Sequence, residues 1–255
     1  MKVSLEQHNV EIHENRRHWE RKPLLRRVYS QFGREIAKRV DRTMPGLVVE
    51  LGSGMGHIKE HLPDCISTDV FPNEWLDRVE NAYNLTFDAG AVSHLILFDV
   101  WHHLEYPGTA LGEFHRVLSE RGKVIIFDPA MGFLGRFVFG NFHHEPLGLG
   151  EEIHWEAPAG LMSSDFGYYA AQGNASRVFG SSAFRERLRS WRVAEVAYLS
   201  GLAYLGSGGF RGPQLYPVAA LPLLNRVDSF LSRFPSLASR MLVVLEKRGE
   251  PSQLG

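Results

Sequence analysis

The sequence has very little cysteine and no excess of charge of either sign. Its 255 residues include one cysteine, Cys65, and carry a formal net charge of −1. A single cysteine excludes an internal disulfide framework and any site that needs several thiolates, such as a cysteine-rich zinc site or an iron–sulfur cluster. The near-neutral balance gives no overall attraction to nucleic acid, so we expect no nucleic-acid partner.

Long hydrophobic runs are also missing. The longest charge-free stretches, residues 196–210 and 212–225, are interrupted by glycine or proline and fall short of the roughly 18 apolar residues of a membrane span. The N-terminal residues are charged and lack the apolar segment of a signal peptide. We therefore expect a cytoplasmic protein without a transmembrane segment, built as one α/β domain with added segments.

A glycine-rich turn is the most informative feature that is present. The apolar run Leu47–Leu51 predicts a buried strand, and residues 52–56 follow it with the sequence Gly-Ser-Gly-Met-Gly. Alternate glycines let the backbone turn sharply and approach a ligand closely. Asp69 ends the next apolar run, where nucleotide-binding α/β units place an acid beside the ribose. The pattern predicts the front half of such a unit.

The turn does not match the two commonest phosphate-binding loops. The dinucleotide fingerprint G-x-G-x-x-G needs a third glycine where this chain has His57. The Gly-Lys-Ser/Thr ending of a P-loop is absent, and no lysine or arginine lies between Glu50 and Ile58. Glu50 would repel a pyrophosphate, and it would attract a cation or an amine.

Residues 50–56 resemble the first motif, E/D-x-G-x-G-x-G, of the class I S-adenosylmethionine-dependent methyltransferases, in particular their small-molecule, type 11-like domain. Further landmarks follow in the family's order at Asp69, 81–87, 99–104 and 114–126, although Asn81 stands where aspartate is common. The resemblance implies S-adenosylmethionine as cofactor and a doubly wound α/β fold with a seven-stranded, Rossmann-like sheet. The cofactor-binding residues that it implies are Glu50, Gly52, Ser53, Gly54, Gly56, His57, Asp69, Val70, Asn81, Ala82 and Asp99.

The chain divides into an N-terminal helical extension (1–45), the methyltransferase domain (46–248) and a tail (249–255). A helix is expected from Pro23, with a basic face that is either solvated or in contact with an anionic group. We expect strands at 47–51, 65–70, 84–85, 94–98, 123–127 and 240–247, and a helix from Pro107. Residues 129–190 break this alternation and are interpreted as an irregular substrate cap.

Histidines are the candidate catalytic residues. His102 and His103 follow the fourth predicted strand, and His143 lies in the cap; histidine is the default general base for a hydroxyl acceptor. A rival interpretation is a metal site in the cap, with ligands from His143, His144, Glu145, Glu152 and His154. Because neither H-E-x-x-H nor facial-triad spacing occurs there, we expect no metal.

The favoured hypothesis is an S-adenosylmethionine-dependent methyltransferase that acts on a small-molecule, glycan or lipid-linked acceptor, with O-methylation favoured. The apolar residues 215–234 either roof the pocket or dip into a membrane interface, which leaves peripheral membrane contact open. The oligomeric state also stays open. The alternatives are an NAD-dependent oxidoreductase and a non-catalytic nucleotide-binding scaffold.

Overall fold

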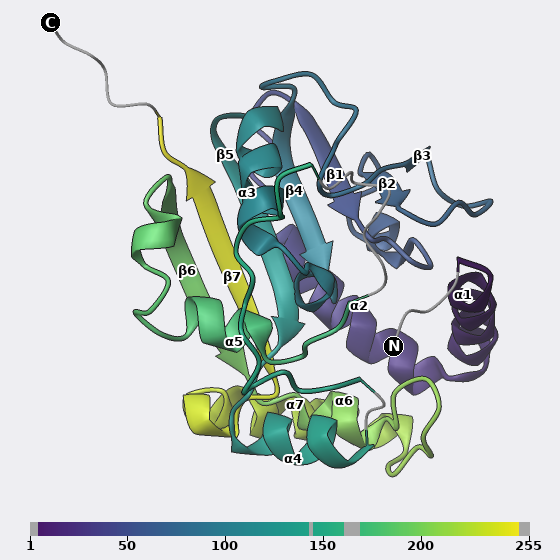
Figure 1. The fold of residues 1–255 in the computed structure, drawn as a ribbon. Helices are drawn as coiled ribbons and strands as arrows, with labels where there is room; N and C mark the ends of the chain where they lie inside the picture. Colours follow the sequence, from purple (N-terminus) through teal and green to yellow (C-terminus); the bar gives the residue numbers. More distant parts are fainter. Residues whose placement is uncertain (1–4, 143–144, 161–168, 250–255) are drawn as a thin grey trace, which may run out of the picture.

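The structure is a computed structural model that describes residues 5–142, 145–160 and 169–249 (Figure 1). Helices α1 (Leu5–Arg21) and α2 (Pro23–Ala37) come first. The next elements are β1 (Leu47–Leu51), the 3-10 helix η1 (His57–Glu60), β2 (Ile66–Asp69), β3 (Arg78–Val79), β4 (Val92–Phe98), the 3-10 helix η2 (Trp101–His103), α3 (Pro107–Val117) and β5 (Leu118–Pro129). They are followed by α4 (Phe133–Phe142), α5 (Asn174–Phe179), β6 (Trp191–Leu199), α6 (Leu202–Gly206), α7 (Leu221–Leu231) and β7 (Arg240–Lys247).

The strands form one seven-stranded sheet in the order β3-β2-β1-β4-β5-β7-β6. Strands β1 to β5 pair in parallel, whereas β7 pairs antiparallel with both β5 and β6. In Figure 1 the arrowheads of β4 and β5 point toward α4, α6 and α7, and that of β7 points the opposite way. This topology confirms the predicted doubly wound α/β fold. Ligands bind in such sheets beyond the carboxyl ends of the parallel strands.

Successive residues of the central strands face opposite sides of the sheet, as the two-residue period of a strand requires. Leu95 and Leu97 of β4 pack in the same core as α3, whereas Ile96 and Phe98 pack in the core formed with α2. Helix α2 begins at Pro23, as predicted, and buries an apolar stripe on that second face. Both faces of the sheet are therefore covered, which explains why β4 is buried along its whole length.

Two local expectations differ from the structure. The third strand is Arg78–Val79 and not 84–85, because Leu85 donates its backbone N–H to Glu113 Oε1 at 2.7 Å in place of a strand partner. Within the described part of 129–190, α4, α5 and the 3-10 helix Glu186–Leu188 are formed, so this segment is less irregular than expected.

Across residues 5–142, 145–160 and 169–249, the helices are too short or too polar to cross a membrane.

Candidate active site

The glycine turn is held in a conformation that only glycine adopts readily. Gly52, Gly54 and Gly56 have φ angles of 68°, 50° and 70°. A side chain at Gly52 would occupy the place of a Val100 methyl group, so the glycine lets the segment after β4 pack against the turn. At Gly54 a Cβ would meet no atom within 4 Å, so the turn opens onto free space there. The turn is therefore packed on one side and open on the other.

Two carboxylates flank the open side of the turn. Asp69, at the end of β2, accepts hydrogen bonds from Gly54 N–H at 3.0 Å and from Phe71 N–H at 3.2 Å. Glu50, in β1, is 1% exposed, and its Oε2 has no hydrogen-bond partner among the described residues. Burial and the nearby Asp69 raise the pKa of Glu50 to about 8, although Ser53 and Lys59 oppose the shift. An unpaired buried carboxylate favours a ligand that brings a cationic or hydrogen-donating group.

Sequence reasoning missed one residue of this wall, Trp75. Its Nε1–H donates to Gly54 O at 2.5 Å, and its ring carries the Arg16 guanidinium 4.5 Å from the centroid. The His13 ring also meets it edge-on at 5.4 Å. Helix α1 therefore covers the glycine turn through Trp75. An aromatic residue six positions after Asp69 was the available signal in the sequence.

The remaining residues of the predicted cofactor set have different surroundings. His57 lies among the rings of Trp19, Tyr29 and Phe98, with both ring nitrogens buried and unpartnered among the described residues. Burial, followed by His61, lowers the pKa of His57 to about 4, so the ring is neutral at pH 7.

Farther from the turn, Val70 is 47% exposed, and Ala82 is half-buried against the core. Asn81 accepts the Tyr83 N–H through Oδ1 at 3.0 Å. Ser53, within the turn, receives the Thr68 N–H at its hydroxyl at 3.0 Å and so ties the turn to β2.

Asp99 follows β4 with a φ of 57° and forms an ion pair with Arg240, the first residue of β7. The Arg240 side chain is 3% exposed and its guanidinium lies 4.6 Å from the centre of the Tyr204 ring. Burial alone would lower the pKa of Arg240, but Asp99, Tyr204 and Tyr29 raise it above its usual value. No local pattern singles out Arg240, which lies 141 residues from Asp99 along the chain.

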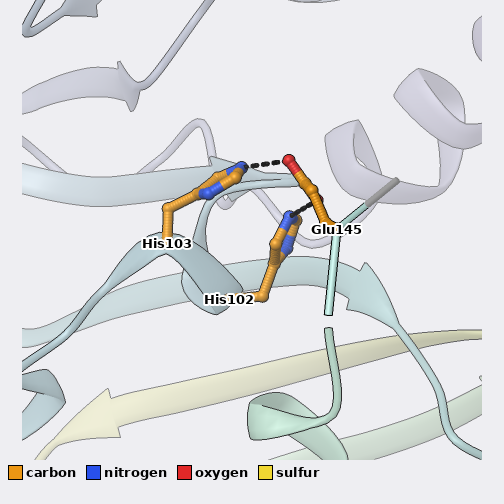
Figure 2. A group of neighbouring side chains, drawn as sticks. All are labelled: His102, His103 and Glu145. Atoms are coloured by element: carbon orange, nitrogen blue, oxygen red, sulfur yellow. Dashed lines mark ion pairs between the residues drawn. The ribbon is translucent and has the colours of Figure 1, made fainter. Parts of the chain in front are cut away.

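The two histidines after β4 lie in η2, and both rings point toward Glu145 (Figure 2). His102 is buried, with Nδ1 2.9 Å from Asp128 Oδ1 and Nε2 3.5 Å from Glu145 Oε2. Burial alone would lower the pKa of His102, but Asp128 and Glu145 raise it to about 10. His103 is more exposed, and its Nδ1 lies 2.8 Å from the Tyr169 carbonyl. The third catalytic candidate, His143, lies outside the described residues.

The site thus combines a glycine turn, two flanking acids and a histidine cluster at the carboxyl edge of a Rossmann-like sheet. Residues 49–126 match the sequence model of a family described as "Methyltransferase domain". A solved structure from Thermotoga maritima, described as a S-adenosylmethionine-dependent methyltransferase and possible histamine N-methyltransferase, is 14% identical, with a TM-score of 0.53 over 93% of this chain and 99% of that chain.

A second similar structure comes from the complex between the Haloferax volcanii Trm112 methyltransferase activator and the putative methyltransferase. It is 17% identical, with a TM-score of 0.49 over 86% of this chain and 90% of that chain. The comparison with curated proteins gave no match.

The family match and the shared fold confirm the resemblance predicted from residues 50–56. Residues 49–126 therefore match a methyltransferase domain in sequence, and the chain as a whole has the fold of a S-adenosylmethionine-dependent methyltransferase.

Proposed function

We propose that this enzyme binds S-adenosylmethionine at the glycine turn and methylates an oxygen of a small-molecule, glycan or lipid-linked acceptor. The observations that carry the cofactor assignment are the free space at Gly54, next to Asp69, and the buried Oε2 of Glu50, which has no hydrogen-bond partner among the described residues. When bound, the cofactor supplies an electrophilic methyl group on a sulfonium.

The residues at the turn fit the two polar ends of that cofactor. Asp69 is an acceptor for ribose hydroxyls, because a carboxylate accepts hydrogen bonds at about four lone-pair sites and its bond to Gly54 N–H holds it beside the turn. Glu50 is an acceptor for the ammonium of the methionyl part, since pairing with a cation offsets the cost of burying a carboxylate. Trp75 adds an apolar surface beside Gly54 and Gly56. Val70, Asn81, Ala82 and His57 complete the proposed set at its margin.

The histidine cluster supports transfer to oxygen. A backbone carbonyl only accepts hydrogen bonds, so the Tyr169 contact requires the proton of His103 on Nδ1. In the neutral ring, Nε2 then carries the lone pair that accepts a proton from an acceptor hydroxyl. His102 is held between Asp128 and Glu145 and positions this segment. His143, in the same stretch of chain as Glu145, stays a candidate from the sequence.

A thermal-shift panel on the purified protein tests the cofactor assignment. S-adenosylmethionine and its demethylated product are expected to raise the melting temperature, and a ligand at about 100 times its Kd adds near 2.7 kcal/mol of stability. NAD and ATP are expected to produce no shift. A response to NAD alone would support the oxidoreductase alternative. Binding of S-adenosylmethionine without turnover on any acceptor would support the scaffold.

An exposed apolar stripe favours a lipid-linked acceptor over a freely soluble one. In α7, Leu223, Val227 and Phe230 are 61%, 37% and 56% exposed at a spacing that places them on one helix face. In α4, Phe133 and Phe137 are 75% and 55% exposed, and α4 packs beside the segment that follows α7. Figure 1 shows α4 and α7 at the carboxyl edge of the sheet. The exposed Arg226 and Arg233 lie near this apolar face in the sequence. An apolar helix face with arginines beside it suits the interface of an anionic membrane.

Co-sedimentation with anionic lipid vesicles tests this contact. Phe230→Asp is expected to reduce vesicle binding strongly while changing stability by no more than about 0.5 kcal/mol, because the side chain is exposed. Val193→Asp, on the edge strand β6 and 43% exposed, serves as the matched control and should leave vesicle binding unchanged. The absence of co-sedimentation by the wild-type protein at low salt would remove the proposed membrane contact.

A further inference from the structure

The geometry points to a divalent transition-metal site formed by His102, His103 and Glu145. One ring nitrogen from each histidine and one carboxylate oxygen lie within 4.8 Å of one another (Figure 2). The site goes beyond methyl transfer and does not depend on it. It also departs from the expectation of no metal, which rested on spacing within the cap alone, whereas these ligands come from η2 and from the cap.

The hydrogen bonds of the two histidines set their tautomers in the way a metal site requires. Metal-binding histidines almost always donate their second ring N–H to a carboxylate or a backbone carbonyl. Here His102 Nδ1 faces Asp128 Oδ1 at 2.9 Å, and His103 Nδ1 donates to Tyr169 O at 2.8 Å. Both Nε2 atoms face Glu145 (Figure 2), and a bound metal ion would displace the proton from Nε2 of His102.

The spacing of the ligand atoms is close to that around a bound ion. Zinc bonds to nitrogen and oxygen are about 2.0–2.2 Å, so neighbouring ligand atoms in a tetrahedral site lie about 3.3–3.5 Å apart. His102 Nε2 and Glu145 Oε2 are already 3.5 Å apart. His103 Nε2 and Glu145 Oε1 are 4.0 Å apart, and a small rotation of the glutamate closes the difference.

The charge of the cluster also favours a dication. Asp128 is fully buried and the Glu145 side chain is only 9% exposed, so two carboxylates lie out of water beside two imidazoles. With neutral rings the cluster carries a charge of about −2, which one divalent ion neutralises. A single proton on His102 would offset only half of that charge.

A further residue holds the carboxylate ligand in place. Gln172 is 2% exposed and donates from Nε2 to Glu145 Oε2. The neighbouring Ala171 N–H donates to His102 O at 2.9 Å, which ties the Gln172 segment to η2. Such outer contacts orient metal ligands and tune their affinity.

Three protein ligands leave at least one coordination position open, as in catalytic zinc sites. Neutral imidazole with carboxylate suits zinc, iron and other first-row divalent ions better than calcium or magnesium. Because His103 Nε2 serves either as a metal ligand or as a free base, the two roles exclude each other at a given moment. A chelator therefore separates them: loss of methyl transfer on chelation favours the ion, and unchanged transfer favours the free base.

Calorimetric titration of the chelator-treated full-length protein with Zn²⁺ tests the site without cofactor or acceptor, and Co²⁺ absorption reports the ligand set. We expect one equivalent to bind to the wild-type protein and to the control His154→Gln, whose histidine is exposed in the same cap. Glu145→Gln and His103→Gln should each weaken binding by about 100-fold or more, since loss of an outer contact alone costs about 10–100-fold.

No binding by the wild-type protein, or binding that both Glu145→Gln and His103→Gln leave unchanged, would overturn the proposal. If Glu145→Gln does not fold, His103→Gln carries the test, because the His103 side chain is 28% exposed. A protein that binds Zn²⁺ in this way but does not respond to S-adenosylmethionine would keep the metal site and remove the proposed cofactor role. A protein that responds to S-adenosylmethionine but does not bind Zn²⁺ would keep the proposed cofactor role and remove the metal site.

Discussion

The glycine turn and the histidine cluster lie along the same edge of the sheet, but they are built in different ways. The turn and its acids come from one stretch of the chain, residues 50–69, and use backbone conformation and short side chains. The histidine cluster joins η2, the end of β5, the cap and the segment before α5. A site formed by residues that are close in sequence can be recognised from a local motif. A site formed by residues that are distant in sequence depends on how the chain folds.

The largest effect is expected at the ion pair between Arg240 and Asp99. Arg240→Met removes the buried cation that pairs with Asp99 and should lower the free energy of unfolding by about 1.5–3 kcal/mol, because a hydrogen bond between charged groups is lost. Urea unfolding measures the change. Arg192→Met is the control, since Arg192 is 54% exposed in its pair with Glu246 and should cost less than about 1 kcal/mol. Equal losses in both variants would contradict the structural role given to Arg240.

A smaller and more local effect is expected at Gly54. Gly54→Ala strains a positive-φ residue at a cost of about 1–2 kcal/mol and places a methyl group in the open space, so S-adenosylmethionine affinity should fall at least about 10-fold. Gly90→Ala is a matched control, with a φ of 74° and open space in the turn before β4. It should show a similar loss of stability with unchanged affinity. If Gly54→Ala and Gly90→Ala bind S-adenosylmethionine with equal affinity, the cofactor does not bind at the turn.

Measured per pH unit, the smallest effect is a pH dependence that belongs to the turn alone. Since the pKa of Glu50 is raised from 4.5 to about 8, folding disfavours its ionised form. Glu50 should therefore reduce the free energy of unfolding as pH rises between those values, by at most about 1.4 kcal/mol per pH unit. Glu50→Gln should remove this slope in urea titrations at several pH values.

Glu35→Gln should change the pH dependence of the free energy of unfolding in the opposite direction to Glu50→Gln. Although burial raises it, Lys38 and Arg39 leave the pKa of Glu35 lowered overall, so Glu35 stabilises the fold above pH 4.5 and its effect is lost as pH falls. A wild-type slope that survives in Glu50→Gln would show that other groups carry it.

The sequence allowed most of the fold and the glycine turn to be predicted. The alternation of apolar runs and helical stripes located β1, β4 and α2, because periodicity reports which face is buried. The two-residue β3 was misplaced because it has too few residues for a period to show.

The contacts of Glu145 and Arg240 could not be predicted in the same way. Glu145 is 43 residues from His102 along the chain. Arg240 begins a strand that its apolar residues alone made recognisable in the sequence. The role of Trp75 was likewise not predictable, because it follows from the hydrogen bond between its indole N–H and Gly54 O. Such pairings follow from how the elements pack and not from any local pattern.

Isothermal titration of the wild-type protein, Asp69→Ala and Asp64→Ala with S-adenosylmethionine tests the cofactor site most directly. Asp69 is buried against Gly54, whereas Asp64 is exposed just before β2. We predict one site in the wild-type protein, unchanged affinity in Asp64→Ala, and a loss of about 100-fold or more in Asp69→Ala, because hydrogen bonds to a charged group are worth about 1.5–3 kcal/mol each. Equal affinity in all three proteins would contradict the account.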